Sequence, residues 1–208
     1  MTHGRYLVVN GSAPEPLPVL AGFHGYAESA EVQMGRLQGI EGAEHWLLVA
    51  VQGLHRFYRG RTNDVVASWM TSQDRKLAIA DNSAYVTGVI DAVSRDWSTS
   101  GILMLSGFSQ GVAMAFRSAT AVSRPSNGVI VCGGDVPPEL DAAALARIPA
   151  VLIGRGIRDE WYTAEKCACD EQRLRSAGVD VEVVAFDGGH EWTPEFSRAV
   201  TGFLSARR

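Results

Sequence analysis

The chain has 208 residues, of which 46% are hydrophobic and 20% are charged, and its formal net charge at pH 7 is −4. This composition is typical of a folded globular protein and excludes a disordered one. The negative charge and the lack of a dense Lys/Arg run argue against nucleic acid or an anionic membrane as the main partner, so a small-molecule or protein substrate is expected.

The lack of a recognisable targeting signal and the number of cysteines favour a cytoplasmic protein. Residues 1–5 lead into a short apolar run rather than a basic region followed by a long apolar one, so we expect no signal peptide. No run approaches the ~18 apolar residues of a membrane span, so no integral membrane association is expected. Three cysteines do not make a disulfide framework. Cys167 and Cys169 point in different directions on an expected helix, which favours free thiols over a metal site, and Cys132 ends a core strand.

Short apolar runs alternate with helical patterns along the whole chain. We expect strands at 6–9, 17–21, 47–51, 102–106, 128–132, 150–154 and 180–186. We expect helices at 29–38, 76–96, 110–122, 161–176 and 194–205. Continuous apolar strands separated by helices predict an α/β fold with a mostly parallel sheet covered on both faces. No repeat or linker divides the chain, so one domain spanning residues 1–208 is expected.

A strand, a sharp turn and a helix are predicted around Gly107-Phe108-Ser109-Gln110-Gly111. A serine on such a turn is exposed by a strained backbone, and flanking glycines allow the strand and helix to approach. The pattern G-x-S-x-G is weak by itself in a chain with 22 glycines. The motif therefore indicates a nucleophilic serine only if the surrounding segments supply its catalytic partners.

Loops that follow other strands carry partners for this serine. The carboxyl ends of parallel strands meet at one edge of a sheet, which is where active sites of such folds lie. Asp159 follows the strand at 150–154, and His190 follows the strand at 180–186, so the chain order is Ser, Asp, His. His190 is the expected base for Ser109, with Asp159 orienting its imidazole. Glu160 and Asp135 are alternative acids.

Two backbone N–H groups are candidates for an oxyanion hole. One belongs to Gln110, directly after the serine, and the other to Tyr26, in the loop after the second strand. His24 precedes Tyr26 in that loop, and we expect it to shape the loop rather than to act as a catalyst.

These residues resemble the phospholipase/carboxylesterase branch of the α/β-hydrolases, which includes acyl-protein thioesterases. The resemblance covers nearly the whole chain. It rests on His24-Gly25 with Ser29, Ser68-Trp69, Gly107-Phe108-Ser109-Gln110-Gly111, Gly154 with Asp159, and Gly189-His190. It implies an α/β-hydrolase fold without a cap domain, no cofactor or metal, and hydrolysis of carboxylic esters or thioesters with the residues assigned above.

Bulky residues depart from the family pattern. Tyr26-Ala27 replaces a small or aliphatic residue followed by Gly, and Trp161-Tyr162 stands where the family tends to have Val-Pro. We assign substrate binding to Trp69, Trp161 and Trp192, with ordinary packing as the alternative for each. The stretch 54–61, with Arg56, Arg59 and Arg61, is interpreted as a solvated loop, and contact with a substrate carboxylate or phosphate is its alternative.

The sequence therefore predicts a serine esterase or thioesterase that forms an acyl-enzyme and acts on a small-molecule ester or thioester. A serine peptidase or an acyltransferase would use the same triad, because fold and triad do not set the substrate. A non-catalytic binding protein with a hydrolase fold is the alternative outside catalysis. The sequence neither requires nor excludes a homodimer.

Overall fold

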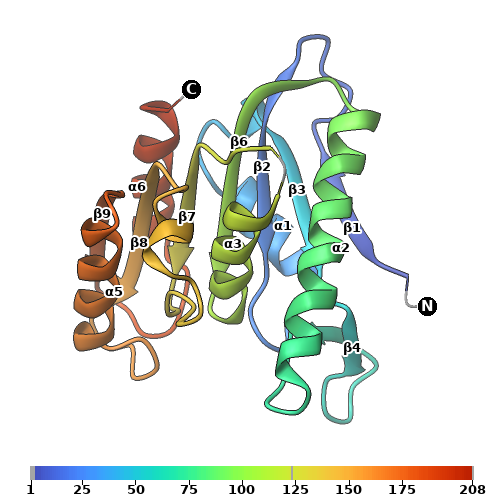
Figure 1. Ribbon diagram of the computed structural model, residues 1–208. Coiled ribbons are helices and arrows are strands. Elements are labelled where there is room, and N and C mark those ends of the chain that lie inside the picture. Colours follow the sequence, from blue (N-terminus) through green and yellow to red (C-terminus); the bar gives the residue numbers. More distant parts are fainter. Residues whose placement is uncertain (1–2, 123, 208) are drawn as a thin grey trace.

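Figure 1 shows the computed structural model of the chain, which describes residues 3–122 and 124–207. The strands of its main sheet are β1 (Arg5–Val9), β2 (Leu17–Phe23), β3 (Leu47–Gln52), β6 (Thr99–Phe108), β7 (Gly128–Cys132), β8 (Ala150–Gly156) and β9 (Asp180–Phe186). Their order in the sheet is β1-β3-β2-β6-β7-β8-β9. β1 pairs antiparallel with β3, and the remaining pairs are parallel. The predicted mostly parallel sheet is confirmed.

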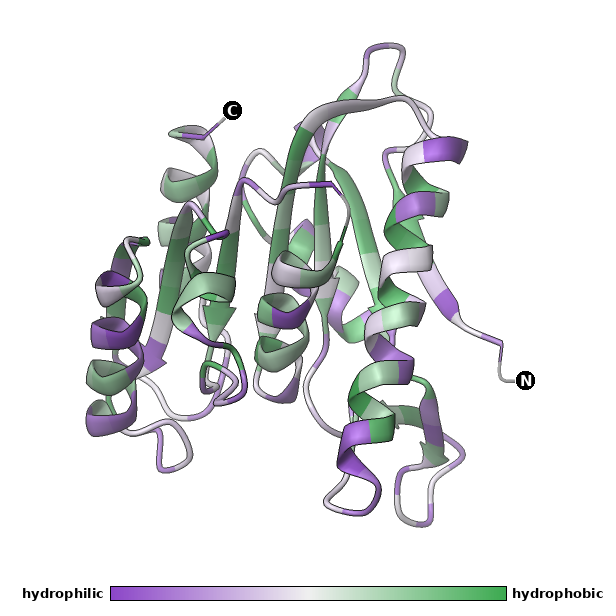
Figure 2. Cartoon of the chain, viewed as in Figure 1, coloured by the Kyte–Doolittle hydropathy of each residue, from purple (hydrophilic) through white to green (hydrophobic). Residues whose placement is uncertain are grey.

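Helices cover both faces of this sheet. They are α1 (Ala30–Gln38), α2 (Arg75–Asp96), α3 (Gln110–Ala121), α4 (Ala142–Leu145), α5 (Ala164–Ser176) and α6 (Pro194–Ser205). In Figure 1, α2, α3 and α5 lie in front of the sheet, and α1 and α6 lie behind it. Figure 2 shows apolar strands in the middle and hydrophilic residues on the outer faces of the front helices.

Two hydrophobic clusters form the core because successive strand residues point to opposite faces. Val19, Ala21 and Phe23 of β2 pack in the cluster that includes α2, α3 and α5, whereas Leu20 packs with α1 and α6. This alternation explains why the buried strands are continuous apolar runs. Both of their faces are covered.

The expected elements occur with small changes at their ends. The helix expected at 161–176 begins only at Ala164. The Asp159 carboxylate accepts the backbone N–H groups of Trp161 and Tyr162. Thr163 is the N-cap residue, and its side chain accepts the backbone N–H of Lys166. No helix in the described ranges is long and apolar enough to cross a membrane.

A two-stranded hairpin is the main element that the sequence did not predict. It consists of β4 (His55–Tyr58) and β5 (Val65–Ser68), and it includes part of the stretch 54–61 that was interpreted as a loop. All four residues of β4 are exposed, so no alternation of apolar and polar residues marks the strand. Two of its arginines make local contacts: Arg56 donates to His3 O, and Arg59 donates to Ala27 O at 2.7 Å.

Candidate active site

Ser109 lies on the sharp turn between β6 and α3, at the carboxyl edge of the sheet, which is the lower edge in Figure 1. Its φ of 51° and ψ of −118° place it in a strained region for a residue with a side chain. The turn is held by a hydrogen bond from Ser109 N–H to the Cys132 carbonyl of β7, at 2.9 Å. The serine is half-buried.

The two glycines of the pentapeptide are required by close approach. A Cβ on Gly107 would lie 2.4 Å from the carbonyl oxygen of Gly111, and a Cβ on Gly111 would lie 2.1 Å from that of Phe23. Both distances are far below a normal contact, so any side chain would push α3 away from the sheet. The strained serine therefore depends on glycine at both positions.

The structure brings His190 to Ser109 and Asp159 to His190. The distance from His190 Nε2 to Ser109 Oγ is 2.8 Å, and that from His190 Nδ1 to Asp159 Oδ2 is also 2.8 Å. The Phe108 ring packs on the imidazole with ring centroids 5.2 Å apart. Because a carboxylate can only accept, Nδ1 carries the proton and Nε2 is left to accept the hydrogen of Ser109.

Asp159 is held in its ionised form. Its side chain is only 1% exposed, and Oδ1 accepts the backbone N–H groups of Trp161 and Tyr162 at 2.8 and 2.9 Å. Burial alone would raise the pKa of Asp159, but these hydrogen bonds and the one from His190 outweigh it and lower the pKa below its ordinary value. A buried carboxylate with all these partners is a rigid acceptor for the imidazole.

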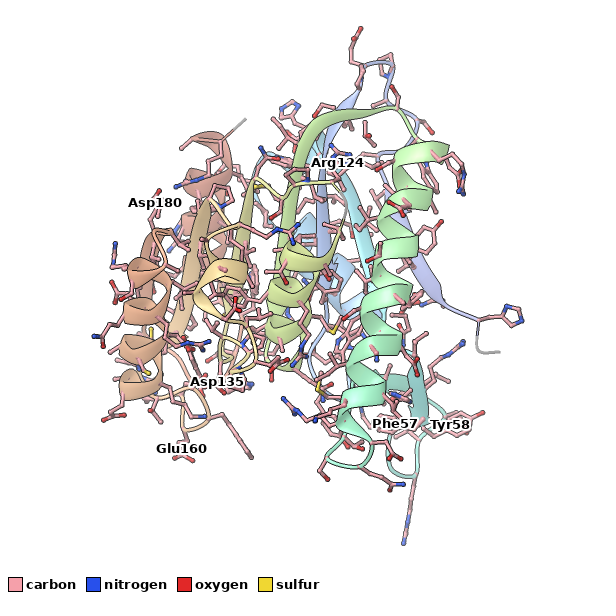
Figure 3. All side chains as sticks on the ribbon, viewed as in Figure 1. Phe57, Tyr58, Arg124, Asp135, Glu160 and Asp180 are labelled. Atoms are coloured by element: carbon pink, nitrogen blue, oxygen red, sulfur yellow. The ribbon has the colours of Figure 1, made fainter. Side chains whose placement is uncertain are left out.

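The two alternative acids lie elsewhere. Asp135 pairs with Lys166 at 3.4 Å. Glu160 is exposed, and Figure 3 shows it at the lower rim of the molecule. Neither has a hydrogen bond or ion pair with His190, so Asp159 is the acid that the structure brings to the imidazole.

The N–H groups of Tyr26 and Gln110 make no hydrogen bond within the described ranges. Both residues line a cavity of about 700 Å³ that also contains Ser109 and His190. Two free donors beside the serine fit the requirement for stabilising an oxyanion.

His24 braces the loop that carries Tyr26. Its Nε2 accepts the Gly53 N–H at 2.9 Å, so its Nδ1 is the protonated nitrogen and donates to the Gly25 carbonyl at 2.7 Å. Burial lowers the pKa of His24, and the ring is completely inaccessible to solvent. Both ring nitrogens are occupied, which leaves none for a substrate.

Glu28 and Arg36 support the same loop, and neither was predicted. Glu28 Oε2 accepts the Gly25 N–H at 2.8 Å, and both carboxylate oxygens of Glu28 bind the Arg36 guanidinium at 2.6 Å. The guanidinium lies 4.2 Å from the centroid of the Phe108 ring, which packs on His190. The only sequence signal was an acidic residue near the start of α1, which is common at helix N-termini.

The side chain of Gln110 has a second task that the sequence did not reveal. Its Oε1 accepts from Ser68 Oγ and from Trp69 N–H, at 3.2 and 2.8 Å, and its Nε2 donates to the Met70 carbonyl at 2.8 Å. The residue after the serine thus anchors the segment that follows β5 and forms one wall of the cavity.

Of the three tryptophans assigned to substrate binding, Trp161 lines the cavity. Trp69 is fully buried and donates to the His24 carbonyl at 2.8 Å, so it supports the oxyanion loop from behind. Trp192 packs edge-on against Phe196, with ring centroids 4.7 Å apart, and donates to Ser197 Oγ. The structure does not bring Trp69 or Trp192 to the cavity.

Among the residues that the structure describes, no group of three or more His, Cys, Asp or Glu side chains is placed to hold a metal ion. Cys132 and Cys167 are buried free thiols, and Cys169 is an exposed one.

A serine on the turn between a central parallel strand and its helix, in a sheet covered on both faces, defines the α/β-hydrolase class. Solved structures share this fold over almost the whole chain. A carboxylesterase from Mesorhizobium loti matches with a TM-score of 0.78 at 19% identity, covering 97% of this chain and 94% of that one. A carboxylesterase from Bacillus cereus matches with a TM-score of 0.77 at 13% identity, covering 99% and 95%. Acyl-protein thioesterase 2 from Zea mays matches with a TM-score of 0.75 at 19% identity, covering 99% of each chain.

At the level of sequence, residues 63–207 match the phospholipase/carboxylesterase family. The chain belongs to that family, as the resemblance indicated. Membership places it among the hydrolases of carboxylic esters.

Proposed function

We propose that the protein is a serine esterase or thioesterase that works through an acyl-enzyme, with Ser109 as nucleophile, His190 as general base and Asp159 as the orienting acid. The observation that carries this proposal is the unbroken hydrogen-bonded chain Ser109–His190–Asp159, with 2.8 Å at each step. A serine hydroxyl is a weak nucleophile at neutral pH and needs such a base.

In the first half-reaction, Ser109 Oγ attacks the substrate carbonyl carbon while its proton moves to His190 Nε2. The carbonyl oxygen becomes an oxyanion that accepts from the N–H groups of Tyr26 and Gln110. The bond to the leaving group then breaks, and the alcohol or thiol departs with the proton from Nε2. The acyl group remains on Ser109 as an ester.

In the second half-reaction, water takes the place of the alcohol. His190 accepts a proton from the water as it attacks the acyl carbon, and then returns it to Ser109 Oγ as that bond breaks. The products are the free acid and the original enzyme. Ionised Asp159 stabilises the imidazolium in both halves without taking its proton.

We also propose that the chain forms one domain. β1 and β9, from opposite ends of the chain, belong to the same sheet, and the residues of the site come from loops along its whole length. A division of the chain would therefore separate Ser109 from the loops that carry Tyr26 or His190.

The test is hydrolysis of p-nitrophenyl acetate by Ser109→Ala, with Ser98→Ala as a control at the opposite end of the sheet. We expect Ser109→Ala to abolish turnover and labelling by a fluorophosphonate probe, and Ser98→Ala to retain both. Full activity or undiminished labelling in folded Ser109→Ala protein would mean that another group is the nucleophile.

A further inference from the structure

The cavity beside Ser109 extends toward the start of α2, where it carries positive charge. Arg75, the first residue of α2, lines this end together with Arg117 of α3. Arg75 is exposed and makes no hydrogen bond or ion pair with any residue in the described ranges. The charge of Arg75 acts on Glu139, but its guanidinium N–H groups lie at the cavity without an acceptor in the described ranges and are free to bind an anion.

Arg117 is buried and holds its own partner. Its side chain is 4% exposed, and its Nε and Nη2 both donate to one oxygen of Glu139, at 2.8 and 2.6 Å. Burial lowers the pKa of Arg117, Glu139 opposes this effect, and the charge of Arg75 adds to it. Arg75 and Arg117 line the same cavity. They are the charged residues that line this end of the cavity, and Glu139, which does not line it, pairs with Arg117.

The opposite end of the cavity differs in charge. Lys166 and Asp135 line that end, and they already pair with each other at 3.4 Å. Asp135 in Figure 3 and the start of α2 in Figure 1 lie on opposite sides of the start of α3. Trp161, which also lines the cavity, follows Asp159, the partner of His190. The Lys166–Asp135 end therefore belongs to the imidazole side of the site.

The chemistry assigns a direction to the substrate between these two ends. The leaving-group oxygen must face His190 Nε2, because it takes its proton there. An acyl group directed away from that nitrogen would meet the wall formed by Met70 and Arg75, which Gln110 anchors through its bond to the Met70 carbonyl. Arg117 lies eight residues after Ser109, about 12 Å along the helix axis, and its side chain leans back toward the helix N-terminus.

We propose that Arg75, supported by Arg117, binds an anionic group at the far end of the acyl chain, so that the preferred substrates are esters or thioesters of acids with a second, terminal negative charge. The inference rests on the proposed function and names its substrate class. A terminal carboxylate matches a guanidinium in shape and charge, since it can accept two parallel N–H groups. It would balance the second cation of the group Arg75, Arg117 and Glu139.

The test compares two esters that differ in whether the terminal carboxylate is free or methylated: the mono-4-nitrophenyl ester of adipic acid and its methyl 4-nitrophenyl diester, with spontaneous hydrolysis subtracted. We expect the wild-type kcat/KM for 4-nitrophenol release to be about tenfold higher for the charged ester, the scale of one charged hydrogen bond. Arg75→Gln should bring the ratio close to one, and Arg75→Lys should keep part of it. High salt should reduce the wild-type ratio.

Lys76→Gln is the matched control, because it removes the same charge from the next residue of α2, which does not line the cavity. It should leave the ratio unchanged. An equal wild-type rate for both esters, or an unchanged ratio in folded Arg75→Gln, overturns the inference. So does a charge preference found only on the alcohol side, measured with 4-acetoxybenzoate against phenyl acetate. Failure of the proposed function is a different result, in which neither ester is cleaved or Ser109→Ala still cleaves both.

Discussion

The carboxylate of Glu28 accepts the backbone N–H of Gly25 at 2.8 Å, and the same carboxylate is clamped by the Arg36 guanidinium. Gly25 directly precedes Tyr26, whose N–H is a candidate oxyanion donor. The ion pair therefore fixes the direction in which that donor points, although neither charged group lines the cavity. Glu28 and Arg36 are positioning residues in this arrangement.

Glu28→Ala should lower kcat for p-nitrophenyl acetate about tenfold, with a smaller effect on KM. Complete loss of an oxyanion donor costs 10²–10³ in kcat, and a loosened donor should cost less. Glu31→Ala, which removes an exposed acid that pairs with Arg5 in the same region, should leave kcat unchanged. If kcat stays at the wild-type level while the melting temperature of Glu28→Ala falls, the role of Glu28 is only structural.

The stability of the protein should depend on Glu28 in acid. Burial alone would raise the pKa of Glu28, but the hydrogen bonds and charge of Arg36 outweigh it, and the net pKa is lowered. The ionised form is thus favoured by folding, and its stabilising effect is present above the unfolded pKa of about 4.3 and is lost as pH falls through the folded value.

Thermal unfolding of wild type and Glu28→Gln between pH 3 and 7 measures this effect. The wild-type advantage in melting temperature should be constant from pH 7 to about pH 5 and shrink below about pH 4. An advantage that grows as the pH falls would reverse the sign and contradict the lowered pKa.

The chain order of strands and loops was readable from sequence because it depends on local signals. Continuous apolar runs marked the buried strands, and Ser109, Asp159 and His190 each follow one of them. Parallel strands place such loops at one edge, so their proximity followed from topology. The hydrogen bonds between the three side chains could be seen only in the structure.

Other features depend on side-chain direction or on contacts between distant segments, which no local pattern encodes. Gln110 was predicted for its backbone N–H, but its side chain bonds to a segment about 40 residues away in sequence. Trp69 and Trp192 lie close in sequence to active-site loops, yet they pack behind them. The exposed residues of β4 gave no alternation from which the hairpin could be predicted.

Ala27→Gly should stabilise the protein by about 1 kcal/mol, because a side chain in the left-handed region costs roughly that amount. Ala27 has a φ of 55°, in the loop between Tyr26 and Glu28. Asn10→Gly is the contrasting change, since Asn10 also has a positive φ, 70°, but its side chain donates to the carbonyls of Ala43 and Trp46. That variant should be destabilised. Chemical denaturation of both variants would measure these changes in stability. A destabilised Ala27→Gly would contradict the prediction that the backbone of Ala27 is strained.

Gln110→Ala should destabilise the protein by about 1–3 kcal/mol, because it leaves the Trp69 N–H without a partner and removes one of the two donors to the Met70 carbonyl, which keeps only Ser68 Oγ. The backbone N–H of residue 110 remains, so the oxyanion donor is kept and kcat should fall less than in Ser109→Ala. Gln172→Ala, on the exposed face of α5, is the control for loss of an amide. Denaturant unfolding and acetate-ester kinetics give both readouts. Wild-type stability in Gln110→Ala would show that the wall does not depend on this side chain.

Trp161→Ala and Trp192→Ala should separate substrate contact from packing. Trp161 lines the cavity with 75% of its surface exposed, and its link to Asp159 is through its backbone N–H, which the substitution retains. We expect Trp161→Ala to raise KM several-fold for esters with aromatic leaving groups, with little change in melting temperature.

Trp192 is half-buried against Phe196, so Trp192→Ala should cost about 2 kcal/mol of stability and leave KM unchanged. A KM effect in Trp192→Ala with none in Trp161→Ala would mean that the substrate occupies a different part of the site. Because the Trp161 side of the cavity is the imidazole side, its effect should follow the leaving group and not the acyl chain.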